Sequence, residues 1–214
     1  MVVAITTIIR RALSHSNNMK IITNFVKPRI QDELEMLFTH GNFPYFYNQA
    51  SCVPADYRQD EKEDSRATGE VLVTENTVES TQFSHALFSN GAINSESYNN
   101  VAPILNKLID IVDGDYFLAR CKVNLNLSNP SLAGKHRTPH IDNGFDKQLT
   151  AIYYVNDSDG DTLFFNKQGH IIQRVTPEKG KLIWWSGKVF HAKEYSTQSK
   201  TRIILNINLL PCES

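Results

Sequence analysis

Two spacings of hydrophobic residues recur along the chain and predict its elements. Apolar side chains three or four positions apart mark residues 29–39 and 97–112 as amphipathic helices. From residue 117 onward, short apolar or alternating runs are separated by Gly, Asn and Asp, a pattern typical of strands. The strands predicted in this part are residues 117–127, 148–156, 161–166, 171–175, 180–186, 189–191 and 201–209. Two earlier runs predict strands at residues 21–26 and 82–88.

These elements predict one mainly β domain with flanking helices, covering residues 19–214. The length of 214 residues and the hydrophobic content of 41% suffice for a single core. Residues 1–18 contain no Asp or Glu and include Arg10 and Arg11, so they differ from the rest. We interpret them either as residues that precede a natural start at Met19 or as a loosely held, disordered extension. An organelle-targeting segment is the alternative.

Composition narrows the partners that we expect. A formal charge of −1 gives no general attraction to nucleic acid or to anionic membranes. No apolar run approaches membrane-spanning length, so no membrane partner is expected. An odd number of cysteines, three, suits a reducing compartment, and we expect a cytoplasmic location.

Metal-binding chemistry is concentrated in the strand-rich part of the chain. His140 and Asp142 are two positions apart, so in a strand their side chains point the same way. His191 follows after several predicted strands, which can bring it to the same point. Two imidazoles and one carboxylate on one face of a metal are typical of non-heme Fe(II) oxygenases. Arg202 stands in an apolar run, where a buried guanidinium requires an anion such as a dicarboxylate.

Competing interpretations of single motifs are weaker. An isolated His-x-Asp triplet is more often a surface pair, so the ordered strands around it carry the prediction. The acidic run at 157–161 lacks the glycine and glutamate positions of a calcium loop and is interpreted as a polar turn. Pro139 makes a helical zinc pair of His136 and His140 improbable, which leaves His136 on a loop at the site mouth.

Residues 117–209 resemble the Fe(II)- and 2-oxoglutarate-dependent dioxygenases, specifically the prolyl-4-hydroxylase-like branch with its phage-encoded members. The resemblance is carried by the order His140, Asp142, His191 and Arg202, by the tyrosine-rich strand at 149–156, and by the turn and strand at 160–165. It implies a double-stranded β-helix, or jelly roll, that holds Fe(II), 2-oxoglutarate and O2. It also implies that no catalytic side chain is needed beyond the metal ligands.

The same resemblance assigns further residues. Arg202, Tyr154, Asn126 and Thr162 are expected to bind the cosubstrate, although relatives often carry Tyr where this chain has Asn126. Tentative substrate contacts are Asn124, His136, Asn206, Asn208 and Trp185. Because nucleic-acid demethylases carry a second Arg at the position of Asn208, the resemblance argues against base demethylation.

The expected activity is hydroxylation of a substrate coupled to oxidative decarboxylation of 2-oxoglutarate, with ascorbate as an optional reductant. A peptidyl or free proline, another amino acid or a different small molecule is the expected substrate. Two other classes stay open: a cupin-like protein with a non-oxidative metal, and a non-catalytic binding module. In the first, Arg202 would be dispensable, and the second would not bind 2-oxoglutarate.

Overall fold

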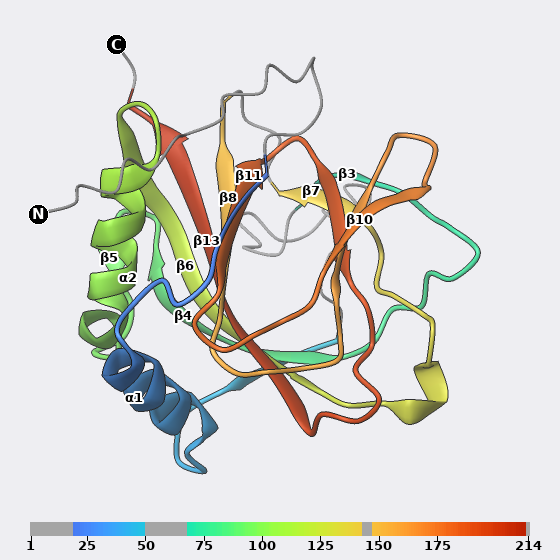
Figure 1. Ribbon diagram of the computed structural model, residues 1–214, viewed down its shortest axis with the longest axis horizontal. Helices are drawn as coiled ribbons and strands as arrows, with labels where there is room; N and C mark the ends of the chain where they lie inside the picture. The colour runs from blue at the N-terminus through green and yellow to red at the C-terminus, as the bar shows by residue number, and fades with distance from the viewer. Residues whose placement is uncertain (1–18, 50–67, 143–146, 213–214) are drawn as a thin grey trace, which may run out of the picture.

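Two β-sheets face each other in the computed structural model, which describes residues 19–49, 68–142 and 147–212 (Figure 1). The larger sheet has the strand order β1-β11-β8-β13-β6-β4-β2, with β5 paired to β4, and the smaller one β10-β9-β12-β7-β3. This arrangement confirms the predicted mainly β class and its flanking helices. The elements are β1 (Lys20–Ile22), α1 (Pro28–Thr39), β2 (Phe46–Asn48), β3 (Thr68–Val71), β4 (Gln82–Ser89), β5 (Ala92–Ile93), α2 (Tyr98–Ile111), β6 (Tyr116–Leu127), the 3-10 helix η2 (Pro130–Leu132), β7 (His140–Asp142), β8 (Leu149–Tyr154), β9 (Thr162–Phe165), β10 (Ile171–Val175), β11 (Leu182–Ser186), β12 (Phe190–Lys193) and β13 (Thr201–Pro211).

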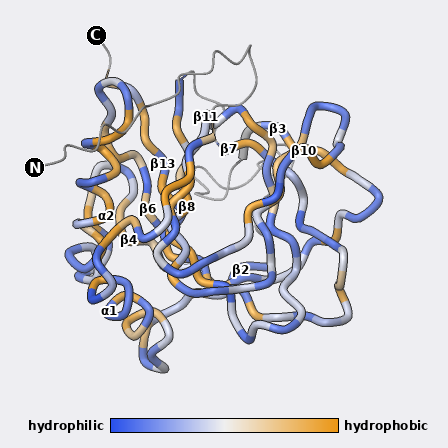
Figure 2. Tube along the Cα trace, in the orientation of Figure 1, coloured by the Kyte–Doolittle hydropathy of each residue, from blue (hydrophilic) through white to orange (hydrophobic). Residues whose placement is uncertain are grey.

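Alternation of side chains gives the larger sheet two different faces. Odd-numbered residues of β6 and β13, such as Cys121, Val123 and Leu205, pack with α1 and α2 in one hydrophobic core. Even-numbered residues of the same strands, such as Asn124 and Asn206, point to the space between the sheets. Both helices cover the outer face of the sheet, and the central strands carry much of the hydrophobic colour in Figure 2. The inner face is therefore available for polar chemistry.

Element boundaries deviate from the predictions mostly at the chain's first strand. The strand predicted at 21–26 ends at Ile22, because Asn24 adopts a left-handed backbone with φ 49°, which a strand cannot continue. Phe25 and Val26 are buried nevertheless. Helix α1 starts one residue earlier than predicted, with Pro28 in its first turn, where its missing N–H costs nothing.

The aromatic residues at 43–47 divide between the core and the surface. Phe43 packs edge-on against Phe38 and Tyr45, with ring centroids 5.0 and 4.8 Å away. Phe46 and Tyr47 are instead 64% and 59% exposed on β2. β2 is the edge strand of the larger sheet, so the rings of both residues stay in solvent although they point to opposite faces.

The extension predicted at 1–18 lies outside the described residues, as do Cys52 and nearly all of the charged segment at 56–68. In the described part of the chain, no helix is long and apolar enough to cross a lipid bilayer. Cys121, predicted to be a core residue, is buried and reduced, and Cys212 is also a free thiol. Burial raises the pKa of the Cys121 thiol to about 12, so it is inert at neutral pH.

Candidate metal and cosubstrate site

His140, Asp142 and His191 converge between the sheets, as the sequence predicts. Strands β7 and β12 are antiparallel neighbours, and their register places His140 directly opposite His191. One donor atom from each of the three side chains lies within 4.8 Å of the others. The His140 and His191 ring centroids are 4.7 Å apart, and His140 Nε2 is 3.9 Å from Asp142 Oδ1. These donors are close enough together to share one cation.

Both imidazoles are oriented by the backbone. The Nδ1 of His140 is 3.0 Å from the Thr138 carbonyl, and that of His191 is 3.2 Å from the Val189 carbonyl. A carbonyl only accepts, so in each neutral ring Nδ1 carries the proton and Nε2 keeps the lone pair that a metal needs. Burial and the nearby His140 lower the pKa of His191 to about 4, against the opposing effect of Asp142. His191 is therefore neutral at physiological pH.

Asp142 is held as a carboxylate by its neighbours. Its Oδ2 accepts hydrogen bonds from Asn208 Nδ2 at 2.8 Å and Thr150 Oγ1 at 3.0 Å, and its Oδ1 lies 3.7 Å from Arg120. Burial would raise the pKa of Asp142. Arg120, the two imidazoles of His191 and His140 in their protonated form at low pH, and the Asn208 hydrogen bond together outweigh burial and hold the pKa of Asp142 well below its usual range. The site thus offers two imidazole nitrogens and one anionic oxygen.

A buried cation occupies the other end of the space. Arg202 is 2% exposed, and its Nε and Nη2 donate to the Gly160 carbonyl at 2.8 Å and to Thr162 Oγ1 at 2.7 Å. Among the described residues, no carboxylate forms an ion pair with this guanidinium. As the sequence predicts, this buried guanidinium requires an anion from outside the described chain.

Tyr154 has a different place from the one predicted. Its hydroxyl is hydrogen-bonded to Thr162 Oγ1 at 2.7 Å, and Arg202 lies 5.7 Å from its ring centroid. The ring is fully buried behind Thr162 and does not line the cavity. In this structure it supports Thr162 and Arg202, and its predicted cosubstrate contact stays a prediction.

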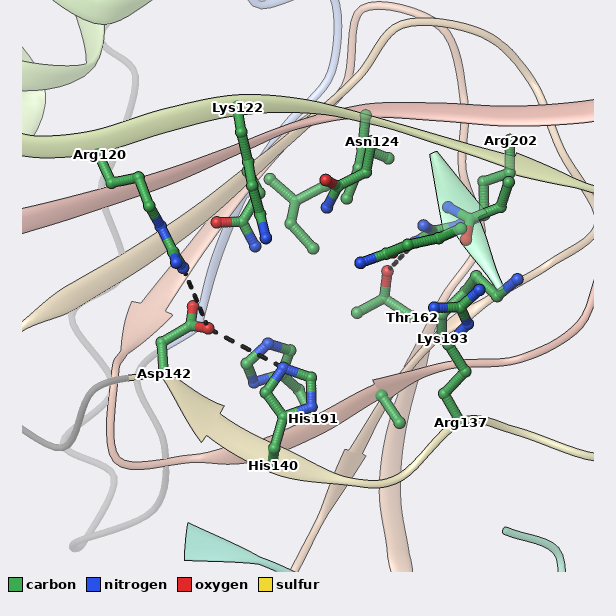
Figure 3. Close-up of a pocket in the computed structure, with 16 residues that line it drawn as sticks. Arg120, Lys122, Asn124, Arg137, His140, Asp142, Thr162, His191, Lys193 and Arg202 are labelled. Atoms are coloured by element: carbon green, nitrogen blue, oxygen red, sulfur yellow. Dashed lines mark hydrogen bonds and ion pairs between the residues drawn. The ribbon is translucent and has the colours of Figure 1, made fainter. Parts of the chain in front are cut away.

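One cavity, partly open to solvent, connects the three-residue cluster with Arg202 (Figure 3). Three amides predicted as pocket residues, Asn124, Asn126 and Asn206, line it. The Oδ1 atom of each is buried without a hydrogen-bond partner in the protein. Buried polar atoms normally have partners, so these three amides are unusual for a protein interior.

Three other tentative substrate residues do not reach this cavity. Asn208 is fully buried and bonds Asp142, so it positions the carboxylate. Trp185 packs edge-on beneath the His191 ring, with centroids 4.9 Å apart. The backbone of His136 forms β-bridges to two neighbouring segments, so this residue is not on an open loop. Its side chain is 3% exposed and its ring is hydrogen-bonded to Thr74. Their predicted substrate contacts are corrected to structural roles.

Four basic residues on the cavity wall were missed by the sequence analysis. They are Arg120 and Lys122 on β6, Arg137 before β7 and Lys193 on β12. Alternation of side chains along β6 could have identified two of them, because Arg120 and Lys122 point to the same face of the strand as Asn124. Burial, aided by repulsion from Arg137 and Arg202, lowers the pKa of Lys193 to about 6.

Residues 125–210 match the family model of the 2OG-Fe(II) oxygenase superfamily. This part of the chain is a 2OG-Fe(II) oxygenase domain. The oxygenase match spans the three converging residues and Arg202. It confirms the predicted family and the predicted enzyme class, a 2-oxoglutarate-dependent dioxygenase of the hydroxylase type, with Fe(II) and 2-oxoglutarate as cofactor and cosubstrate. No curated protein sequence matches the chain.

Solved structures share the fold of this oxygenase at low sequence identity. The epimerase SnoN from nogalamycin biosynthesis has a TM-score of 0.57 at 12% identity, over 91% of this chain and 79% of its own. A Trichoplax adhaerens prolyl hydroxylase, in complex with a hypoxia inducible factor peptide fragment, has a TM-score of 0.56 at 16% identity, over 90% and 84%. A viral collagen prolyl hydroxylase from Paramecium Bursaria Chlorella virus-1 has 0.51 at 13%, over 98% of both chains. These likenesses confirm the jelly roll and include the predicted prolyl hydroxylases.

The residues present fit the superfamily's cofactor and cosubstrate. Two Nε2 lone pairs and an ionised carboxylate are the donor set of non-heme Fe(II) sites. Arg202, buried and without a carboxylate partner in the described chain, suits the far carboxylate of 2-oxoglutarate. In the oxygenase, metal donors and dicarboxylate anchor therefore lie in one cavity.

Proposed function

We propose that His140, Asp142 and His191 bind Fe(II), and that Arg202 and Thr162 bind the far carboxylate of 2-oxoglutarate. The protein then hydroxylates an amino-acid substrate, free or within a peptide. The observation that carries this proposal is the pairing, in one cavity, of a metal-ready cluster with a buried guanidinium that has no carboxylate partner.

Each side chain has a defined task in this proposal. The Thr138 and Val189 carbonyls hold the two imidazoles with Nε2 directed at the cation. Asn208 and Thr150 hold Oδ2 of Asp142, which leaves Oδ1 for the metal. When bound, iron and 2-oxoglutarate supply O2 activation, in which 2-oxoglutarate becomes succinate and CO2 and the substrate gains a hydroxyl group. Ile152, Ala192 and Ile204 are the apolar residues of the described cavity wall.

The fold match supports an amino-acid substrate by analogy. The Trichoplax prolyl hydroxylase was solved with a peptide fragment bound, and its fold matches this chain. A peptidyl proline is accordingly one candidate and a free amino acid another, because fold alone does not fix the substrate. Ascorbate stays the expected reductant.

The test of this proposal is an anaerobic titration with Fe(II) and 2-oxoglutarate, followed through the weak visible band of the chelate. The wild-type protein is expected to develop the band at one equivalent. Arg202→Met should weaken 2-oxoglutarate binding by about 10- to 100-fold, because a charge-assisted hydrogen-bond pair to a carboxylate is lost. Arg29→Met, an exposed arginine on α1, is the matched control and should bind like the wild type.

The rival classes predict different results in the same titration. A cupin-like protein with a non-oxidative metal would bind metal but form no 2-oxoglutarate band, and Arg202→Met would change nothing. A non-catalytic module would bind neither. Either result, obtained with protein whose circular dichroism shows it folded, would contradict the proposal.

A further inference from the structure

Lys193 is an inward-facing lysine at the cosubstrate end of the cavity. It lies on β12 two positions after His191, so both side chains point between the sheets, and both line the cavity. The register places Lys193 directly opposite Thr162 of β9, whose hydroxyl accepts a hydrogen bond from Arg202. Figure 3 shows Lys193, Thr162 and Arg202 on the same side of the cavity. Three polar side chains from three strands therefore meet at this end.

The amine of Lys193 has no acceptor for its N–H groups in the part of the chain that the structure describes. Its Nζ lies 4.4 Å from the centre of the Tyr195 ring, and it forms neither a hydrogen bond nor an ion pair with a described residue. Glu79 has the weakest electrostatic effect on Lys193 and lies 3.7 Å from Arg137 instead. An aromatic ring covers one side of an amine only, so the other N–H groups of Lys193 stay available.

The surroundings of this amine favour a bound anion. Arg137 and Arg202 repel a positive charge on Lys193, and burial adds to their effect. A carboxylate beside Lys193 would oppose both effects. Nζ has N–H groups to donate in its charged and in its neutral form, so such a contact requires no change of protonation.

Arg202 by itself does not fill the far carboxylate of 2-oxoglutarate. Two of the five N–H groups of this guanidinium donate to Gly160 and Thr162 within the protein. A carboxylate has about four acceptor sites, of which an arginine occupies about two through parallel hydrogen bonds. Because buried acceptors normally have partners, a further donor is expected at this end. Lys193, across from Thr162, is placed to be that donor.

The position of Lys193 relative to the metal cluster also fits a short dicarboxylate. Lys193 follows His191 by two residues, a separation of about 7 Å along the strand. Extended 2-oxoglutarate is of similar length. One molecule can therefore reach the cation with its ketoacid end and Lys193 with its far end.

These contacts assign Lys193 to the cosubstrate anchor, and this inference rests on the proposed function. We propose that the far carboxylate of 2-oxoglutarate bridges Arg202 and Lys193, with Lys193 Nζ donating a hydrogen bond to it. Lys193 is then a binding residue that selects 2-oxoacids with a second carboxylate. The alternative is a structural lysine that only packs on Tyr195.

The test compares two 2-oxoacids that differ only at the far end. 2-Oxoglutarate and 2-oxopentanoate, which has a methyl group in place of the far carboxylate, are titrated into the Fe(II) protein without oxygen. The visible band of the chelate reports the binding of both acids. In Lys193→Met the preference for 2-oxoglutarate should be about 10- to 100-fold smaller than in the wild type, the effect of one hydrogen bond to a charged group.

Further variants assign this effect to the amine. Lys193→Arg keeps a donor and should retain most of the preference. Lys167→Met, an exposed lysine in the turn before β10, is the matched control and should retain all of it. If Lys193→Met does not bind Fe(II), Lys193→Leu replaces it and should show the same smaller preference.

The binding of 2-oxopentanoate separates a direct contact from a structural role. A structural lysine would weaken both acids equally when it is replaced, and the preference would not change. An unchanged preference in Lys193→Met, whether both acids bind as in the wild type or both bind more weakly, would overturn the inference.

Failure of this inference is distinguishable from failure of the proposed function. If the wild type forms no chelate band with 2-oxoglutarate, the proposed function fails. If the band forms and Arg202→Met reduces the preference for 2-oxoglutarate, but Lys193→Met does not, only the inference on Lys193 fails.

Discussion

Among single residues, Asp142 depends on its neighbours more than any other member of the site. Its two oxygens face different partners: Oδ2 accepts from Asn208 and Thr150, and Oδ1 lies near Arg120 and His140. Asn208 is itself fixed, because its Oδ1 accepts from Arg120 Nε at 2.9 Å. One buried amide therefore connects a cation on the cavity wall with the metal-binding carboxylate.

Asn208→Ala is expected to weaken metal binding by about 10- to 100-fold, because Asp142 loses the hydrogen bond that orients it. The measurement is an anaerobic Fe(II) titration, with unfolding in urea run in parallel to show that the variant is folded. Asn100→Ala, an exposed asparagine on α2, is the control. Equal metal affinity in Asn208→Ala and the control would show that Asn208 does not position Asp142.

At the scale of elements, the connection between β8 and β9 supports the cosubstrate end. Asp159 accepts hydrogen bonds from the backbone N–H groups of Thr197, Gln198 and Ser199 at 2.8 to 3.0 Å, which ties this connection to the segment that leads into β13. Gly160, next in the chain, offers its carbonyl to Arg202. The turn interpreted from sequence as a polar hairpin therefore positions the anchoring guanidinium.

Gly160→Ala should damage both stability and cosubstrate binding. A Cβ at this position would lie 2.9 Å from the Glu194 carbonyl and 3.0 Å from the Ser196 nitrogen, so the two segments must separate. We expect a loss of about 1–3 kcal/mol in the free energy of unfolding, and a weaker 2-oxoglutarate complex. Gly41→Ala, with no atom near the added Cβ, is the control. If Gly160→Ala binds 2-oxoglutarate as tightly as the wild type, this turn does not position Arg202.

Asp159→Asn should reduce stability in a pH-dependent way. Burial would raise the pKa of Asp159, but the hydrogen bonds from Ser199, Thr197 and Gln198 outweigh it and lower that pKa. A lowered folded-state pKa stabilises the protein above the unfolded value of about 3.9, and this contribution is lost as the pH falls below it. We expect the variant to be about 1 kcal/mol less stable at pH 7, since the group is partly exposed.

Urea unfolding of the wild type and Asp159→Asn at several pH values measures this difference. It should be constant from pH 8 to about pH 5 and shrink towards pH 3. A difference that grows as the pH falls would have the wrong sign and would contradict the assignment.

For the whole molecule, periodicity predicted the faces of the strands but not the depth of their side chains. Alternation placed Asn124 and Asn206 on the inner face, and both line the cavity. It placed Asn208 there too, yet Asp142 and Arg120 fill the space beside it. Depth depends on how the two sheets close, which involves contacts distant in sequence. The convergence of His140, Asp142 and His191 was predictable because side chains that share one cation must lie close together.

Ligand binding should stabilise the whole fold, because the proposed ligands bind residues from both sheets. With a redox-stable substitute, Mn(II), and 2-oxoglutarate at about 100 times its dissociation constant, the gain is about 2.7 kcal/mol. This corresponds to a rise of several degrees in Tm, measured by calorimetry. In Arg202→Met, at the same 2-oxoglutarate concentration, the part due to 2-oxoglutarate should fall to about 0.4–1.4 kcal/mol. An equal rise in that variant would place the dicarboxylate away from Arg202.

The most direct test of the central claim is an anaerobic crystal structure with Fe(II) and 2-oxoglutarate, using anomalous scattering at the iron edge. We expect one iron peak bonded to His140 Nε2, Asp142 Oδ1 and His191 Nε2, with the far carboxylate of 2-oxoglutarate on Arg202 and Thr162. An iron peak at any other place, or a carboxylate on Lys122 and Arg120 with Arg202 left unbound, would contradict the account.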